Sequence, residues 1–389
     1  MQRCLRKDRA PPSPGDSSID VQPGVRLDTP QPCRAYTCEL SMEPYNLTVL
    51  PFSAVISDQS AYNSQAHTAE DISTAVSKSL VRLPPDVVYA WPPPEPYAYG
   101  LYANLVAESQ RIPPDKRLDL AMPSFIAREL LTLQASFLAT NHVSDTRVAE
   151  VAEDWQDSRT CRSTFGSAFA DGAKWFVRLD DASPKDSPTR MPVTSAKQLV
   201  RMLATSMRAR AEVERKLEDG REIIVFLRLW DGAMGSGIEF RCFIPPLAVH
   251  AARSRPDGKA EMKNWTLSAM SQYTWHRPFP PASTTKSFAR DIVETALNGA
   301  KCCTAEVLNT AREVGALDEL KKWGFVMDVV VKLQGSGYDV QLVEVNPFGA
   351  VSGCGSCLFH WLRDAEQLHG LKDQIEVRIA IDGQGEAAI

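Results

Sequence analysis

Three side chains late in the sequence have the types and spacing of a metal–phosphate site. The segment 325–348, FVMDVVVKLQGSGYDVQLVEVNPF, predicts a β-hairpin, because two runs rich in β-branched residues flank the turn residues QGSG. Residues i and i+2 of a strand share a face, so Glu344 and Asn346 point the same way and Asp328 can lie opposite them. Mg²⁺ is usually held by one or two carboxylates together with substrate phosphates. The hairpin therefore favours a nucleotide-bound magnesium site, and a charged strand edge facing water is the alternative.

Basic residues that could meet phosphates end an earlier predicted strand. The strand 174–179, KWFVRL, contains Arg178 and leads into the polar turn DDASPKD, which includes Ser183 and Lys185. An arginine can bind phosphate through two parallel hydrogen bonds, and a lysine binds it as a point charge. The turn therefore predicts a phosphate contact, and an ordinary surface turn is the alternative.

Two further predicted strands carry charged residues among apolar ones. The segment 223–230, IIVFLRLW, is apolar except for Arg228, and an arginine inside a buried strand needs an anion to offset its lost hydration. In 237–244, GIEFRCFI, strand alternation places Glu239 and Arg241 on one face. A cross-strand ion pair between Arg228 and Glu239 is one interpretation, while a ligand site accounts for Arg241 as well.

Composition is that of an ordinary soluble globular chain. The 389 residues correspond to two or three domain-sized units, with 44% hydrophobic and 23% charged residues. A net charge of −5 offers no bulk attraction for nucleic acid or anionic lipid, and no apolar run is long enough to span a bilayer. The nine cysteines are scattered and no signal peptide precedes them, which indicates reduced thiols in an intracellular compartment. We expect a cytoplasmic protein with no nucleic-acid or membrane partner.

Helical periodicity and proline content organise the rest of the chain. Residues 1–40 are rich in Pro, Ser, Asp and Arg and predict a disordered tail. Apolar residues at helical spacing predict a helix over 123–140 and a second one over 195–218. A third helix is expected over 288–320, broken near Asn298-Gly299.

The pair Cys354-x-x-Cys357 has the spacing of a redox or zinc motif. A structural zinc site needs about four ligands, and His360 is the only histidine close to these cysteines in the sequence. The pattern therefore gives little support to a metal or redox role for Cys354 and Cys357.

Six short motifs follow one another between residues 174 and 350: FVRLDDASPKD, FLRLW, IEFRCFI, SQY, FVMDVVV and LVEVNPF. Their order resembles the cell division cycle protein 123 family, whose pattern runs W-S-[AS]-P-[KR]-D, L-R-K-W, E-F-R-C-F-V, Q-Y, F-D-V-Y and L-I-D-F-N-P-F. The first 120 residues match that pattern only loosely.

The resemblance implies an α+β fold of the ATP-grasp type, in which two α+β lobes clasp ATP and Mg²⁺. It implies an assembly factor that promotes formation of the trimeric translation initiation factor 2 by binding its gamma subunit, and it implies a monomer. By matching position, the residues expected to bind ATP are Arg178, Ser183 and Lys185 at the phosphates, Arg228 and Trp230 beside the adenine hinge, Glu239 facing the ribose, and Arg241 reaching the phosphates. The expected metal ligands are Asp328, Glu344 and Asn346.

The chain departs from the family pattern at several of these positions. Arg178 replaces the lysine that ends the strand before the family's W-S-[AS]-P-[KR]-D turn, Leu229 replaces the lysine of L-R-K-W, and Glu344 replaces the aspartate of L-I-D-F-N-P-F. The pattern's N-W becomes Asp180-Asp181, which predicts added negative charge where phosphates would lie and hence weaker ATP binding.

The resemblance also divides the chain. We expect a tail at 1–40, a region at 41–150 packing on the first lobe, a first lobe with the hinge at 151–285, a second lobe with the metal-binding hairpin at 286–370, and a C-terminal tail at 371–389. Two other functions stay open. One is an ATP-grasp ligase that works through an acyl phosphate, for which Arg253, Arg255 and Lys259 could bind a substrate carboxylate. The other is a scaffold that binds protein without nucleotide. Whether the chain is an enzyme is therefore open, and no residue is assigned a catalytic role.

Overall fold

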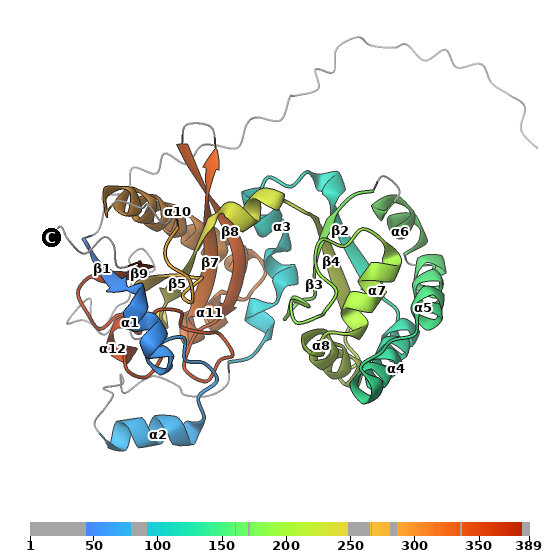
Figure 1. Cartoon of the computed structure of the whole chain (residues 1–389), viewed down its shortest axis with the longest axis horizontal. Helices are drawn as coiled ribbons and strands as arrows, with labels where there is room; N and C mark the ends of the chain where they lie inside the picture. The colour runs from blue at the N-terminus through green and yellow to red at the C-terminus, as the bar shows by residue number, and fades with distance from the viewer. Residues whose placement is uncertain are drawn as a thin grey trace, which may run out of the picture. The chain divides into compact units, whose positions relative to one another are not determined.

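Two β-sheets, each covered by its own helices, position the predicted site residues (Figure 1). The computed structural model describes residues 44–78, 92–159, 161–169, 172–247, 265, 267–280, 286–334 and 337–382. Both sheets belong to one unit of the chain, which starts at Leu40. The expected α+β class is confirmed. Among the described residues, no helix combines the length and the apolar character needed to cross a membrane.

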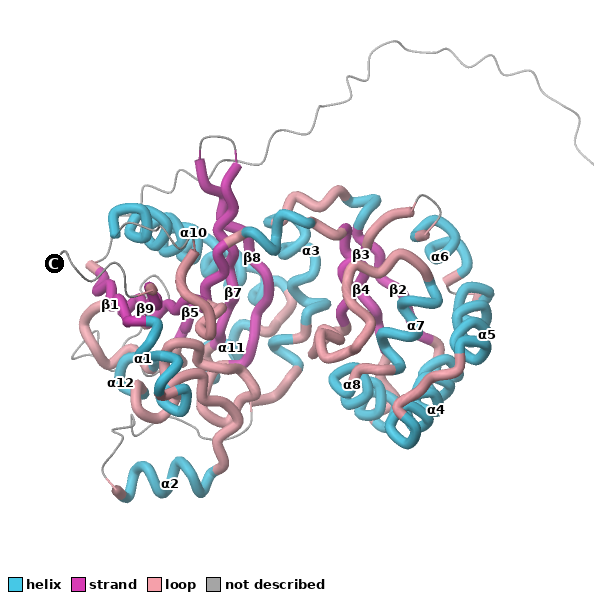
Figure 2. Tube along the Cα trace, in the orientation of Figure 1, coloured by secondary structure: helices cyan, strands magenta, loops and turns pink. Residues whose placement is uncertain are grey.

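The smaller sheet is antiparallel, with strand order β2-β4-β3. Its strands are β2 (Arg117–Met122), β3 (Trp175–Arg178) and β4 (Ile223–Leu229). The helices that share its core are α4 (Ser124–Thr140), α5 (Asp145–Asp157), α6 (Arg162–Ala168), α7 (Ala196–Ala204) and α8 (Met207–Glu218) (Figure 2). The predicted helix over 123–140 is confirmed as α4.

The helix predicted over 195–218 is instead two helices, α7 and α8. The side chain of Ser206 accepts a hydrogen bond from the backbone N–H of Ala209 and so caps the start of α8. The chain turns at Thr205 and Ser206, and the two helices meet the sheet separately.

The larger sheet has the strand order β1-β9-β6-β5-β7-β8. β9 runs parallel to both β1 and β6, and the remaining pairs are antiparallel. Its strands are β1 (Tyr45–Pro51), β5 (Ile238–Ile244), β6 (Ala269–Gln272), β7 (Phe325–Gln334), β8 (Gly337–Pro347) and β9 (Ile375–Ile381). The predicted hairpin over 325–348 is confirmed as β7 and β8.

One face of the larger sheet packs on helices α3 (Tyr99–Ser109) and α10 (Lys286–Glu313), with α11 (Leu317–Trp323) beside them. Shorter elements complete the described chain: α1 (Phe52–Ser57), η1 (Gln59–Ala61), α2 (Ala69–Ser77), η2 (Glu95–Tyr97), η3 (Pro114–Lys116), η4 (Gly232–Ser236) and α12 (Ala365–Leu368).

Two sequence predictions need correction. The C-terminal tail expected at 371–389 is wrong for Ile375–Ile381, because these largely apolar residues form β9 inside the sheet. The break expected near Asn298-Gly299 is absent, since α10 runs unbroken to Glu313.

The expected lobe boundaries differ from the strand pairing. The range 151–285 contributes β3 and β4 to the smaller sheet but β5 and β6 to the larger one, and 41–150 likewise supplies β1 to the larger sheet and β2 to the smaller. The tail expected at 1–40 lies outside the described residues.

A β-bulge in the hairpin sets the direction of the site residues. Asp328 pairs with Glu344, but the next residue, Val329, pairs with Leu342, so Val343 is the extra residue on β8. Leu342 therefore points into the core with α10, while Glu344 points to the opposite face. Without the extra residue, Leu342 and Glu344 would share one face.

Candidate functional site

One line of paired residues crosses the larger sheet from edge to edge, and we call it the polar row. Each member lies opposite the next on the neighbouring strand: Thr48, Arg378, Ser271, Arg241, Asp328 and Glu344. A row of hydroxyl and charged side chains across a whole sheet is costly to bury unless its members neutralise one another. The β7–β8 end of the row holds the predicted site.

Arg241 and Asp328 form a buried, two-pronged ion pair. Arg241 donates to both oxygens of Asp328, from Nε at 2.8 Å and from Nη2 at 2.7 Å, and its Nη1 donates to the carbonyl of Gly355 at 2.6 Å. The carboxylate of Asp328 has no exposed surface. Burial raises the pKa of Asp328, Arg241 acts against that rise, and the neighbouring Glu344 adds to it.

Glu344 forms an ion pair with an arginine of the other sheet. Arg178, at the end of β3, donates from Nη1 to Glu344 Oε2 at 3.0 Å. Burial alone would raise the pKa of Glu344, but Lys185, Arg178 and Arg241 outweigh burial and hold that pKa well below its usual range. Asn346, on the same face of β8, donates to Asp328 Oδ2 at 3.4 Å. The ion pair between Arg178 and Glu344 joins the predicted phosphate residues to the predicted metal residues.

A third carboxylate lies beside this pair. Burial raises the pKa of Glu239 to about 8, Asp328 adds to the rise, and Lys185 acts against it. The structure thus brings together most of the predicted site residues: Arg178, Lys185, Glu239, Arg241, Asp328, Glu344 and Asn346.

Arg228 has a different partner from the one considered from sequence. Its Nη1 donates to Asp119 on β2 at 2.8 Å and to the carbonyls of Leu118 and Leu227 at 3.0 Å, so the cross-strand pair with Glu239 does not form. The reason is topology, because β4 and β5 belong to different sheets. The expectation that a buried arginine finds an anion is met by Asp119.

Two predicted nucleotide residues retain polar atoms without partners among the described residues. Ser183 Oγ and Arg228 Nε are both buried and make no hydrogen bond. Trp230, the other predicted hinge residue, is half-buried, and its backbone N–H donates to the carbonyl of Lys174 at 2.8 Å. Buried donors that no protein group satisfies fit a ligand rich in acceptor oxygens.

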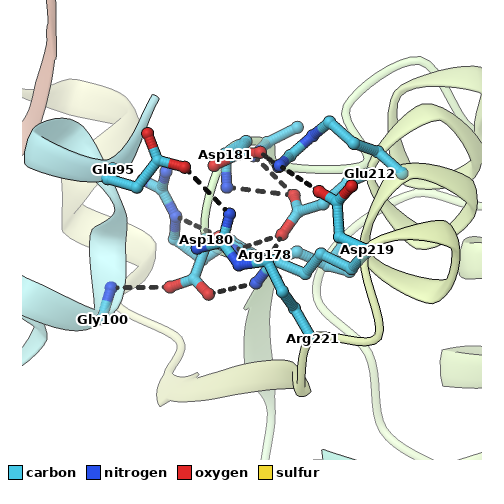
Figure 3. Close-up of polar contacts among 12 residues, drawn as sticks. Glu95, Gly100, Arg178, Asp180, Asp181, Glu212, Asp219 and Arg221 are labelled. Atoms are coloured by element: carbon cyan, nitrogen blue, oxygen red, sulfur yellow. Dashed lines mark hydrogen bonds and ion pairs between the residues drawn. The ribbon is translucent and has the colours of Figure 1, made fainter. Parts of the chain in front are cut away.

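Asp180 and Asp181 each have a cationic partner on α8 (Figure 3). Lys216 on α8 donates to Asp180, and Arg215 on the same helix donates to Asp181. Glu212, one turn before Lys216, accepts the backbone N–H groups of both aspartates at 2.9 and 3.0 Å. Sequence spacing gave no signal for this pairing, because α8 follows the turn by some thirty residues.

Tyr99, at the start of α3, is a site residue that sequence reasoning missed. The guanidinium carbon of Arg178 lies 4.1 Å from the centre of its ring, and that of Arg228 lies 5.7 Å away. The residue is 5% exposed. Nothing in the sequence links Tyr99 to Arg178 or Arg228, because the three residues meet only through tertiary packing.

The cysteine pair is buried beside this site. Cys354 and Cys357 lie in the loop that follows β8, whose Gly355 carbonyl binds Arg241. Burial raises the pKa of Cys354 to about 12 and raises that of Cys357 further. Buried thiols with raised pKa values are poor nucleophiles and poor metal ligands. Within the described ranges, no group of three His, Cys, Asp or Glu side chains could hold a metal ion.

The oxygen donors of the hairpin fit a magnesium ion shared with phosphates. Two carboxylates and one amide are too few for an all-protein cage but enough for Mg²⁺, which keeps several water or phosphate oxygens. Arg241 already occupies both oxygens of Asp328, whereas Arg178 occupies only Oε2 of Glu344. Glu344 is therefore the more available of the two carboxylates. The basic loop with Arg253, Arg255 and Lys259 lies outside the described residues.

No protein-family profile matches this chain, and neither does any curated protein. Among solved structures, the chain is similar to that of Cdc123 from Schizosaccharomyces pombe, at 15% sequence identity and a TM-score of 0.40. The similar region covers 73% of this chain and 96% of the yeast chain. A likeness at this level says nothing about what this chain binds.

Proposed function

We propose that this chain binds ATP with magnesium at the cluster formed by β3, β5, β7 and β8, and that it acts as a nucleotide-dependent protein-assembly factor. The observation that carries the proposal is the ion pair between Arg178 and Glu344. It brings a phosphate-type cation from one sheet against a metal-type carboxylate from the other. A nucleotide with a bound cation needs both kinds of group within one site.

Each side chain of the proposed site is assigned to the part of ATP–Mg²⁺ that its charge and hydrogen-bonding groups suit. Arg178, Lys185 and the unpartnered hydroxyl of Ser183 would hold phosphate oxygens, as would Arg241, whereas Glu239 would accept from the ribose hydroxyls. Arg228 and Trp230 would border the base. Asp328, Glu344 and Asn346 would hold Mg²⁺, which would neutralise part of the phosphate charge. Arg178, Lys185 and Arg241 face Glu239, Asp328 and Glu344, and the pKa of Glu239, raised to about 8, leaves fewer negative than positive charges in the cluster at neutral pH.

The proposed client is the gamma subunit of trimeric translation initiation factor 2. This part rests on the order of the six sequence motifs. A nucleotide that joins residues of two sheets would favour one relative placement of those sheets, and a client that prefers this placement would bind more tightly when ATP is present.

Calorimetric titration of the purified protein with ATP, with and without Mg²⁺, tests the nucleotide site. The isosteric variants Asp328→Asn and Glu344→Gln remove one metal-type carboxylate each. The matched control is Asp364→Asn, because Asp364 forms the same two-pronged pair with Arg378 of the polar row, away from the hairpin. We expect magnesium-dependent binding by the wild type and by the control, and loss of binding in both hairpin variants. Absence of binding by the wild type would overturn the proposal.

The client proposal has its own test. Purified gamma subunit is mixed with the wild type or with Glu344→Gln, with and without ATP and Mg²⁺, and complex formation is followed by size-exclusion chromatography. We expect a complex that the nucleotide strengthens only for the wild type. If the wild type binds nucleotide but forms no complex, the client proposal is wrong and the nucleotide-site proposal is unaffected.

A further inference from the structure

Glu212 holds the turn that follows β3 by its backbone. Its carboxylate accepts three consecutive N–H groups, from Asp180 at 2.9 Å, Asp181 at 3.0 Å and Ala182 at 3.2 Å (Figure 3). Successive N–H groups that point at one carboxylate form an anion-binding concavity, as phosphate loops do for their ligand. Here a buried side chain of α8 occupies that concavity, and its residue is 3% exposed.

Lys216 completes the attachment from the next turn of α8. It lies 3.4 Å from Glu212 and also donates to Asp180, although its own exposure is only 2%. Burying a lysine is costly unless carboxylates surround it. Two buried charges on one helix are thus directed at the same three-residue turn.

Asp180 connects this turn to α3. Its Oδ1 accepts the backbone N–H of Gly100 at 2.9 Å, and its carbonyl accepts the N–H of Tyr99 at 3.0 Å. Helix α3 is in turn fixed to the larger sheet, because Ser109 and Gln110 bond both backbone groups of Leu342 on β8. Asp180 therefore links α8 beside the smaller sheet to α3 on the larger sheet, two residues from Arg178.

We propose that Asp180, Glu212 and Lys216 form a positioning unit for the nucleotide site: they fix the turn after β3, so that Arg178 and Tyr99 are held in place for the phosphates and the base. None of the three would touch the ligand. The inference rests on the proposed nucleotide binding and adds residues that set its strength.

The geometry of the turn explains why such a unit is needed. β3 ends at Arg178, and beyond it two backbone hydrogen bonds lie within the turn, from the N–H of Leu179 to the carbonyl of Ala182 and from the N–H of Lys185 to the carbonyl of Ser183, both at 2.8 Å. Ser183 and Lys185 follow immediately. Without Glu212, three adjacent N–H groups would lose their acceptor, and the chain between Arg178 and Lys185 would be free to shift. A shift of about 1 Å in a binding group can cost a hundredfold in function.

The experiment compares ATP–Mg²⁺ affinity, by calorimetry, with amide hydrogen exchange in the absence of ligand. The variants are Asp180→Asn, Lys216→Met and the double variant Glu212→Gln/Lys216→Met, which removes one charge of each sign together and so keeps the net charge of the protein. The control is Val213→Ala, which weakens the packing of the same helix without touching the turn, since Val213 belongs to the core of the smaller sheet.

We expect the three test variants to bind ATP–Mg²⁺ about tenfold more weakly or worse and to exchange the amides of 180–182 and of Gly100 faster. Val213→Ala is expected to lower the urea midpoint while affinity and exchange at these amides stay as in the wild type. If the test variants bind like the wild type, or if Val213→Ala weakens binding as much as they do, the three residues are merely structural and the inference is wrong. If the wild type does not bind ATP, the proposed function itself is wrong, and the positioning unit then has no nucleotide site to support.

Discussion

At the scale of single residues, two neighbouring carboxylates have opposite electrostatic environments. Asp328 is fully buried with one arginine, and burial raises its pKa, whereas Glu344 faces three cations that lower its own. Opposite shifts in adjacent acids commonly mark sites built to bind charge. The difference follows from position, because Glu344 lies on the edge strand β8, where Arg178 and Lys185 from the other sheet can reach it.

The ring of Tyr99 supplies the first prediction. Tyr99→Leu removes an aromatic face from two buried guanidinium groups, each contact being worth about 1–2 kcal/mol when desolvated. We expect urea denaturation to show a loss of about 2–3 kcal/mol in the free energy of unfolding. Tyr99→Phe keeps the face and loses only the hydroxyl, so about 1 kcal/mol is expected. Equal losses in the two variants would show that the ring contributes packing alone.

At the scale of elements, the bulge in β8 decides which way Glu344 points. Inserting one alanine between Asp328 and Val329 gives Val343 a partner on β7, which restores plain alternation and forces either Glu344 into the core beside α10 or Leu342 into the polar row. Either result places a group in the wrong environment, and we expect a loss of about 3 kcal/mol or more in the free energy of unfolding. Val343→Ala keeps the extra residue and is expected to cost less than about 1.5 kcal/mol. Urea denaturation of both variants checks the comparison.

Gly299 gives a prediction whose sign opposes helix propensity. Alanine is favoured over glycine by about 1 kcal/mol inside a helix, yet a Cβ at Gly299 would overlap the side chain of Val340 on β8. We expect Gly299→Ala to lower the thermal midpoint, and to lower it less in a Val340→Gly background, because the Cβ of Val340 is the atom nearest to the added methyl group. A Gly299→Ala variant that is more stable than the wild type would mean that α10 can move away from the sheet.

The same glycine shows where sequence reasoning reaches its limit. The hairpin, the helix over 124–140 and the shared face of Glu344 and Asn346 follow from local periodicity and were predictable. The low helix propensity of glycine predicts a break at Gly299, but this glycine instead allows α10 to pack closely on β8. The sequence also gives no signal that Asp119 pairs with Arg228 or that Glu212 binds the turn after β3, because these partners are far apart in the chain. Local patterns do not specify tertiary partners.

At the scale of the whole molecule, a buried histidine makes stability depend on pH. His369 is 1% exposed, and burial lowers its pKa from 6.5 to about 4. The unfolded chain therefore protonates His369 near pH 6.5, and the folded chain protonates it only near pH 4. The free energy of unfolding keeps its full value above about pH 6.5 and falls as the pH drops towards 4. The titration of His369 accounts for a loss of roughly 3 kcal/mol in the free energy of unfolding at the acid end of that range.

Replacing this histidine should flatten the acid limb of the stability curve. The urea midpoint of His369→Asn, measured between pH 7 and pH 4, is expected to fall less than that of the wild type. The exposed His142→Asn is the control and should follow the wild type. Parallel curves for all three proteins would show that other groups govern acid sensitivity.

The pairing of β1 with β9 bears on the order in which the molecule forms during synthesis. Thr48 on β1 reaches Glu376 on β9 across 328 positions of sequence, whereas all three strands of the smaller sheet lie between Arg117 and Leu229. Contacts between distant residues form late, and a growing chain folds first what has already left the ribosome. The smaller sheet can therefore fold before β9, the neighbour of β1, has been synthesised. Arg178, the turn after it and α8 are then in place before Glu344 is made, so the proposed nucleotide site is completed only in the last stage of folding.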